Sequence, residues 1–197
     1  MARPRSFDRD TVLDRVRDLF WERGYAATSL TDLEAASGLR RTSLYNAFGN
    51  KEDLYATVLE RYRSAAKQFR AGAMANAPDP VSGIKTLITD SVEATLADAQ
   101  RKGCLINNAT NERAALCTQT MDFVVANREE FVAEFSEYLR IAREANGKWS
   151  QSPEELAVYL FAVYSGMMSL VRSGTEPEVV RKALRVGLAV LDSRKSC

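Results

Sequence analysis

The sequence predicts an all-α protein of about nine helices. Apolar side chains recur every three to four residues through nearly all of the 197-residue chain, as on one face of a helix, and we find no convincing alternating strand pattern. Serine, asparagine and glycine stand where these repeats begin and end, as expected of helix caps. A hydrophobic fraction of 46% with a formal net charge of +1 indicates an ordinary globular chain with a sizeable core.

Four helices are expected in the N-terminal part. The first carries an apolar stripe formed by Val12, Val16, Leu19 and Phe20, and Gly24 is the glycine expected to end it. Ser29 caps a short second helix with Asp32 in its first turn, and Gly38 follows the end of that helix. The third helix runs from about Arg41 to Phe48, and a fourth begins at Lys51.

Five more helices are predicted after a linker at residues 71–82, which contains Ala-Pro-Asp-Pro. Their expected extents are about 84–102, a short helix from 104, 118–146, 152–172 and 176–191. Ser152 followed by Pro153 and two glutamates is a strong helix start. We expect two domains, residues 1–62 and residues 63–197.

The composition excludes several classes of active site. The chain has no histidine, so it offers no Ser-His or Cys-His nucleophile pair and no histidine metal ligand. Its cysteines, at 104, 117 and 197, form no CxxC pair, and neither a P-loop nor a GxGxxG motif occurs. We therefore expect no catalytic residue, no metal and no cofactor. Without a secretory signal or an apolar run long enough to span a membrane, a cytoplasmic location is the expectation.

The segment from Phe20 to Lys51 carries the functional signal. Two short helices meet at a turn that contains Gly38, which is typical of a helix-turn-helix. In that motif the second helix enters the major groove of DNA. Its N-terminal end here has side chains that can pair with bases or phosphates, namely Arg40, Arg41, Thr42 and Ser43. Residues 1–70 carry 13 Lys and Arg against 10 Asp and Glu, whereas the rest carries 14 against 16.

This segment strongly resembles the N-terminal domain of the TetR family of transcriptional repressors. The matching residues, in family-like order and spacing, are Gly24-Tyr25, Ala27-Thr28-Ser29, Leu33, Ala36, Gly38, Leu44-Tyr45, Phe48 and Lys51. The resemblance implies an all-helical homodimer with an N-terminal helix-turn-helix DNA-binding domain. It also implies a C-terminal domain for ligand binding and dimerisation, which releases double-stranded operator DNA when it binds an inducer of unknown identity.

The resemblance assigns roles to individual positions. The expected DNA-binding residues are Thr28, Arg40, Arg41, Thr42, Ser43, Tyr45, Asn46 and Lys51. Thr28, Tyr45 and Lys51 match family residues that contact the DNA backbone, and Arg3 and Arg5 resemble a basic arm ahead of the first helix. Structural alternatives stay open here: packing for Tyr45, a solvent-exposed helix start for Lys51, and a tail without contacts for the arm.

Gly103-Cys104-Leu105 resembles a junction at the start of the sixth helix in one subgroup of these repressors. Some members of such subgroups respond to electrophiles or oxidants through cysteine. Independently, Arg101 and Lys102 precede Cys104, and a thiol at a positive helix terminus favours the reactive thiolate. Cys104 is therefore a candidate sensor, and a small buried thiol is the structural alternative.

An apolar ligand pocket is the other sensing option. Its candidate lining residues on the long helices are Met121, Phe135, Tyr138, Tyr164, Met167 and Met168, each with ordinary core packing as the alternative. The last two helices carry apolar residues on more than one face, which predicts pairing with a second copy. The leading interpretation is a dimeric repressor of a palindromic operator. The alternative is a helical small-molecule-binding protein without DNA-binding activity.

Overall fold

The computed structural model describes residues 7–145 and 149–192, and that part of the chain is helical with no strand. The all-α prediction is confirmed. The described α-helices are α1 (Arg9–Arg23), α2 (Leu30–Ser37), α3 (Arg41–Phe48), α4 (Lys51–Ala75), α5 (Pro80–Ala97), α6 (Leu105–Thr110), α7 (Thr118–Ala145), α8 (Pro153–Arg172) and α9 (Pro177–Leu188). Two short 3₁₀ helices follow α6 and α9, namely η1 (Arg113–Ala115) and η2 (Ala189–Leu191).

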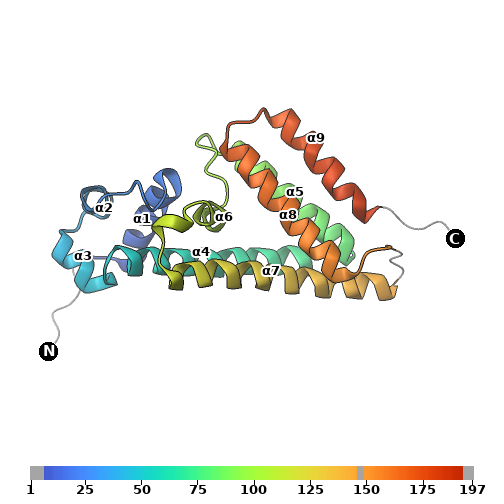
Figure 1. Ribbon diagram of the computed structural model, residues 1–197, viewed down its shortest axis with the longest axis horizontal. Coiled ribbons are helices and arrows are strands. Elements are labelled where there is room, and N and C mark those ends of the chain that lie inside the picture. The colour runs from blue at the N-terminus through green and yellow to red at the C-terminus, as the bar shows by residue number, and fades with distance from the viewer. Residues whose placement is uncertain (1–6, 146–148, 193–197) are drawn as a thin grey trace.

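Two long helices, α4 and α7, run side by side along the molecule (Figure 1). At one end of them lie α1, α2 and α3, with α1 packed against both α2 and α4. Toward the other end lie α5, α8 and α9, with α8 packed along α7. The short α6 contacts α4, α7 and α8. It therefore lies between α8 and the two long helices.

The polar caps predicted from the sequence begin three of the helices. Ser29 and Ser152 begin α2 and α8, and each exchanges hydrogen bonds with the acidic residue three positions on. Asn50 forms the same reciprocal arrangement at the start of α4. Because such caps satisfy backbone groups that a helix end leaves unpaired, each contributes about 1 kcal/mol. Ser29 and Asn50 thereby fix the starts of α2 and α4, the helices that flank α3.

Two expected boundaries were wrong. The linker expected at residues 71–82 is helical at both ends, since α4 continues to Ala75 and α5 begins at Pro80. Alanine is the strongest helix former, and the alanines of this stretch extend α4. The fifth helix ends before residue 98 rather than near residue 102. There the Asp98 carboxylate accepts the backbone N–H groups of Gln100 and Lys102. These hydrogen bonds turn the chain away from the helix.

The fourth helix is continuous across residue 62, where the sequence analysis places a domain boundary. Near its start, Tyr55 packs edge-on against Phe20 of α1, with 4.8 Å between the ring centroids. Near its end, Arg70 forms an ion pair with Glu134 of α7. α4 therefore contributes to both parts of the molecule, and the division into two domains stays a prediction.

One described helix, α8, is long and apolar enough by length and composition to cross a membrane. One face of it belongs to the bundle core, because Leu156, Leu160, Met168 and Val171 are buried against neighbouring helices. Burial of each such side chain stabilises the fold by about 1.5–3 kcal/mol. The packing along α7 and against α9 accounts for this apolar face.

Candidate nucleic-acid interface

The turn between α2 and α3 has the local geometry of a helix-turn-helix. Gly38 adopts a left-handed conformation with φ of 70°, and its N–H donates to the carbonyl of Glu34, which closes α2. The Glu34 carboxylate also accepts the backbone N–H of Arg41 at 2.6 Å. Leu33 and Leu44 are buried beneath the two helices. Polar and apolar contacts therefore set α3 firmly relative to α2.

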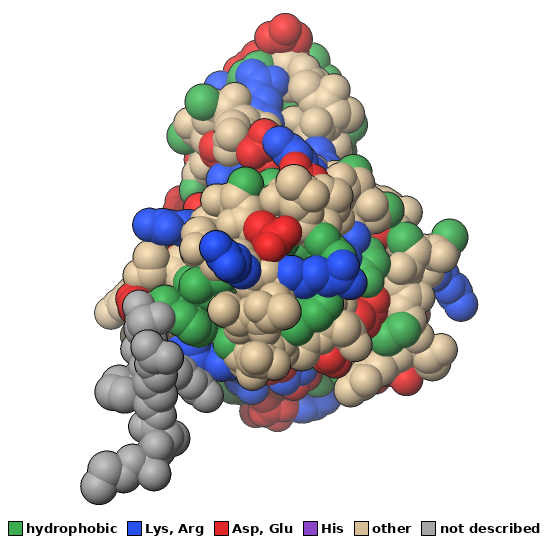
Figure 2. Space-filling view, turned by 90° about the vertical axis from the view of Figure 1, so that its left-hand side faces the viewer, with side chains coloured by type: hydrophobic (Ala, Val, Ile, Leu, Met, Phe, Trp, Pro, Cys, Tyr) green, Lys and Arg blue, Asp and Glu red, His purple; other side chains and the backbone are tan. Residues whose placement is uncertain are grey.

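The first turn of α3 is open to solvent. Arg40, Arg41, Thr42 and Ser43 are all exposed, and neither arginine forms an ion pair with a described carboxylate. Figure 2 looks onto this end of the molecule, where Lys and Arg side chains gather near the middle of the face beside acidic ones. A helix start whose two arginines pair with no described carboxylate can bind phosphates and base edges.

The other predicted contacts on this face differ in exposure. Asn46 is exposed, and Tyr45 is half-buried with the guanidinium of Arg41 5.4 Å from its ring centre. Thr28 is only 1% exposed, and its hydroxyl donates to the carbonyl of Gly24 at 2.6 Å. The Thr28 hydroxyl is therefore engaged within the fold, where it closes the turn before α2.

Lys51, at the start of α4, is packed onto an aromatic ring. Its ammonium lies 4.2 Å from the centre of the Tyr25 ring, a distance at which cation–π attraction operates. Burial lowers the pKa of Lys51, and the nearby carboxylates of Glu112 and Glu52 oppose that shift. The side chain is thus held at the margin of the α3 face by Tyr25.

Arg9 is a positioning residue that the sequence analysis missed. Its Nη1 donates to the carbonyl of Ala47 at 2.6 Å, and its guanidinium lies 4.2 Å from the Phe48 ring centre. Arg9 therefore ties the start of α1 to the last turn of α3. An arginine at a helix start carries no sequence signal for partners 38 residues away. Arg3 and Arg5, the predicted basic arm, lie outside the described residues.

Glu52 joins the starts of α4 and α7, another link that the sequence analysis missed. Its Oε1 accepts the N–H of Cys117 at 3.3 Å and the hydroxyl of Thr120. Burial of the Glu52 carboxyl opposes its ionisation, but hydrogen bonds from Thr120 and Tyr25 outweigh this effect and lower its pKa. Burial, together with the hydrogen bond to Glu52, raises the pKa of Tyr25. The start of α7 is thereby fixed beside Lys51.

Two adjoining cavities share α4, α7 and α8 in their walls. The larger, of about 420 Å³, is also lined by α6, and the smaller, of about 270 Å³, is also lined by α5. Three of the predicted pocket residues line them, namely Met121, Phe135 and Tyr164. The other three predicted residues lie outside both linings. Tyr138 is half-buried, and Met167 and Met168 are buried. The contribution of α4, which supplies Tyr62 and Arg70 to both cavities, was not predicted from the sequence.

Cys104 is the N-cap residue of α6, lines the larger cavity and is 8% exposed. It lies beside two tyrosines of that cavity, Tyr62 and Tyr164. Burial raises the pKa of both phenols well above the ordinary value, and interaction with the Cys104 thiol adds to the shift. Cys117, in contrast, is exposed just before α7. Cys197 lies outside the described residues.

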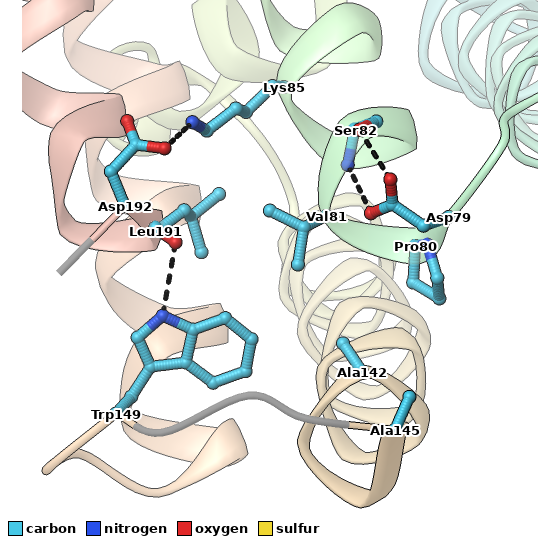
Figure 3. Close-up of a pocket in the computed structure, with 10 residues that line it drawn as sticks. All are labelled: Asp79, Pro80, Val81, Ser82, Lys85, Ala142, Ala145, Trp149, Leu191 and Asp192. Carbon is cyan, nitrogen blue, oxygen red and sulfur yellow. Dashed lines mark hydrogen bonds and ion pairs between the residues drawn. The ribbon is translucent and has the colours of Figure 1, made fainter. Parts of the chain in front are cut away.

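A third cavity, of about 390 Å³, lies at the end of the molecule opposite α3 (Figure 3). The indole N–H of Trp149 donates to the carbonyl of Leu191 at 3.2 Å beside it, and Lys85 pairs with Asp192. None of the functional residues predicted from the sequence lines it. We assign it no role.

Comparisons with known proteins agree with this geometry. Residues 12–58 match the family described as "Bacterial regulatory proteins, tetR family". The HTH-type transcriptional repressor ComR of Escherichia coli (strain K12) is 53% identical over 68 residues, which are 34% of this chain and 32% of that protein. The HTH-type transcriptional regulator YezE of Bacillus subtilis (strain 168) is 27% identical over 198 residues, covering 98% of this chain and 100% of YezE.

Solved structures extend the similarity to the whole fold. A cysteine mutant of the TetR family transcriptional regulator CifR, complexed with 26-bp double-strand operator DNA, is 31% identical with a TM-score of 0.83. That match covers 95% of this chain and 98% of the CifR chain. The reduced form of E. coli NemR, 22% identical with a TM-score of 0.80 over 91% of this chain and 94% of its own, shares the fold. The chain therefore belongs to the TetR family of transcriptional regulators.

Proposed function

We propose that the protein is a homodimeric repressor that binds a palindromic double-stranded DNA operator through α3 of each protomer. The observation that carries this proposal is the exposed row of Arg40, Arg41, Thr42 and Ser43 at the start of α3. Two cations that pair with no carboxylate of the described residues, together with two hydroxyls at one helix start, suit base edges and phosphates. The operator complex of CifR supports the same use of this fold.

The remaining predicted contacts would act from the margins of that row. In this proposal Tyr45 and Asn46 contact the backbone from the next turn of α3, and Lys51 reaches a phosphate from its place over the Tyr25 ring. Thr28 acts indirectly, because its hydroxyl closes the turn that leads into α2. Phosphate contacts of this kind set register and supply affinity, whereas the contacts from the start of α3 supply sequence preference.

The exposed face of α8 and α9 supports the dimer. Val158 and Tyr159 of α8 are 56% and 42% exposed, and Val179 and Val186 of α9 are 52% and 76% exposed. Val179 and Val186 are seven residues apart and so share one face of α9. Gly166 of α8 has no neighbouring atom where a Cβ would stand, which leaves room for close helix approach. An apolar face of this kind on two adjacent helices suits a twofold four-helix interface.

The two cavities, the larger of which lies beside α6, support release by a small molecule or by modification of Cys104. The larger one has the size of common ligand pockets and is lined by side chains from four helices. Because α6 also contacts α4, a ligand beside it can bias the helix that carries Lys51. The proposal assigns no enzymatic activity to the chain and places it in the cytoplasm, with the DNA.

Selection of bound sequences from random double-stranded DNA tests this function. We expect enrichment of one palindrome by the wild-type protein. The Arg40→Ala/Arg41→Ala variant should lose that enrichment, whereas Arg15→Ala, an exposed arginine of α1, should retain it as a matched control. If the folded wild-type dimer enriches no sequence, the proposal is wrong and the small-molecule-binding alternative replaces it.

A further inference from the structure

The two cavities between α4, α7 and α8 form two lobes of one site. They share five lining residues, namely Tyr62, Ala66, Arg70, Phe131 and Tyr164. The smaller lobe is apolar, with Leu87, Ile88 and Phe135 in its wall. The exposed ring of Phe69 lies in the same lining. A ligand that fills both lobes would therefore meet apolar side chains at one end and charged and polar side chains at the other.

The larger lobe carries positive charge without a carboxylate in its lining. Its charged residues are Arg70, Arg113 and Arg128. No described carboxylate lies within ion-pair distance of Arg113, and the one near Arg128 is its chain neighbour Glu129 at 3.9 Å. Three arginines in a lining that contains no carboxylate favour an anionic group, although Glu134 pairs with Arg70 from outside that lining.

Arg70 provides the buried part of that charge. It is 9% exposed and lines both lobes, so it stands where they meet. Its Nε donates to Oε2 of Glu134 at 2.9 Å, but Nη1 and Nη2 make no hydrogen bond to any described residue. A guanidinium has five N–H donors, and a buried one gains from every acceptor it meets. Two nitrogens of Arg70 therefore remain for a ligand.

Ser165 adds a second unsatisfied group. Its hydroxyl oxygen is buried in the lining of the larger lobe and has no hydrogen-bond partner among the described residues. Buried hydroxyls in folded proteins almost always have a partner, and one left over in a cavity wall indicates a polar ligand atom. The amide of Asn107 lies nearby and donates to the Ser169 hydroxyl at 3.3 Å.

We propose that this site binds an amphipathic organic anion of the carboxylate class. The anionic group contacts Nη1 and Nη2 of Arg70 and the hydroxyl of Ser165, with Arg113 and Arg128 adding long-range attraction. The apolar body lies against Leu87, Ile88 and Phe135 in the smaller lobe. This inference rests on the inducer site of the proposed function and names its ligand class. We therefore expect a neutral molecule of the same shape to bind less tightly than the anion.

Calorimetric titration of the DNA-free protein tests the ligand class directly. The probes are octanoate, decanoate and dodecanoate, each compared with its primary amide, which has the same length and no charge. We expect at least one acid to bind, and to bind about tenfold or more tightly than its amide, the ratio expected of a charge-assisted hydrogen bond. Equal affinity for an acid and its amide, or no binding of any acid, would overturn the inference.

Variants identify the side chain that distinguishes the anionic ligand from the neutral one. Arg70→Gln combined with Glu134→Gln removes both members of the buried pair, so that neither charge is left alone. It should abolish the preference for the acid over its amide. Arg140→Gln, an exposed arginine of α7 outside both lobes, is the matched control and should retain the preference. If the double variant does not fold, Arg113→Gln with Arg128→Gln should weaken acid binding alone, and an unchanged ratio would contradict the proposal.

A parallel operator-release assay separates this inference from the proposed function. If an acid binds but the operator stays bound, the ligand class stands and release by this site is wrong. If other compounds release the operator while every acid fails to bind, the repressor function stands and the ligand class is wrong.

Discussion

The carboxylate of Glu112 accepts the backbone N–H of Tyr25 at 3.1 Å, across 87 residues of sequence. Its second oxygen accepts the N–H of Ala26 at 2.8 Å. A Cβ at Gly24 would lie 2.7 Å from the same carboxylate, so the contact also requires a glycine there. Glu112 follows α6, whereas Tyr25 precedes α2. This contact joins the segment after α6, beside the larger cavity, to the turn that leads into the helix-turn-helix.

Loss of the Glu112 carboxylate should weaken the link between these two segments. We expect Glu112→Ala to destabilise the protein by about 1–2 kcal/mol, because two N–H groups lose a charged acceptor. Glu112→Gln, which keeps one acceptor oxygen, should cost less. Denaturant unfolding measures both changes, and equal stability of Glu112→Ala and wild type would contradict the link.

Gly24 offers a second test of the same contact. Its φ of 86° and ψ of 167° form a region nearly closed to residues with a Cβ, so Gly24→Ala strains the backbone in any background. In wild type the new Cβ also meets the Glu112 carboxylate. Gly24→Ala should therefore destabilise the wild-type protein more than it destabilises the Glu112→Ala variant. Equal losses in the two backgrounds would mean that Glu112 moves aside.

Lys51 should supply affinity rather than sequence preference. We expect Lys51→Ala to weaken specific and non-specific DNA binding alike. It should also flatten the plot of log affinity against log salt by about 0.9 per monomer, as for one lost phosphate contact. Lys67→Ala, an exposed lysine of α4 farther from the N-terminal helices, should leave the slope unchanged. A wild-type affinity and slope in Lys51→Ala would remove Lys51 from the interface.

The dimer should depend on the exposed apolar face of α8 and α9. Leu184 and Leu188 of α9 belong to the protomer's own core, at 4% and 7% exposed, so charges there would unfold the chain rather than separate a dimer. We expect Val158→Asp with Val186→Asp to give a folded monomer, since a paired apolar interface does not accept unpaired charges. Sedimentation measures the change, with Ile141→Asp on α7, 45% exposed, as the control. A wild-type monomer at micromolar concentration would contradict the twofold model.

Burial changes the expected order of cysteine reactivity. The sequence predicts that Cys104 reacts fastest with electrophiles, but it is 8% exposed whereas Cys117 is exposed. We therefore expect bulky charged reagents to label Cys117 first, and small neutral ones to reach Cys104 through the larger cavity. Mass spectrometry of labelled peptides measures both rates. Operator release by oxidant from a Cys104→Ser variant would exclude Cys104 as the sensor.

The sequence was sufficient for features that depend on local patterns. The capping residues Ser29, Asn50 and Ser152 predict helix starts because each acts within three positions of its own backbone. The helical period predicts which face of α1 is buried, and Val16 and Phe20 are at most 1% exposed. The placement of α3 after Gly38 follows from the same local chemistry.

Contacts between distant segments could not be predicted in this way. Arg9, Glu52 and Glu112 each look like solvent-exposed charges on helix ends or turns, yet their partners lie 38, 65 and 87 residues away. Periodicity also cannot say which neighbour covers a side chain. It therefore did not reveal the burial of Thr28 or the position of Lys51 over Tyr25.

The central claim, that the start of α3 reads base sequence, is tested most directly by the base-preference matrix of Arg41→Ala. The measurement compares binding of wild type, Arg41→Ala and Arg15→Ala to every single-base variant of the selected operator. We predict that Arg41→Ala relaxes preference at one symmetric pair of positions by about 1–3 kcal/mol, the discrimination of one bidentate contact, and that Arg15→Ala changes nothing. A wild-type matrix in both Arg41→Ala and Thr42→Ala would contradict the claim, because the reading side chains would then lie elsewhere.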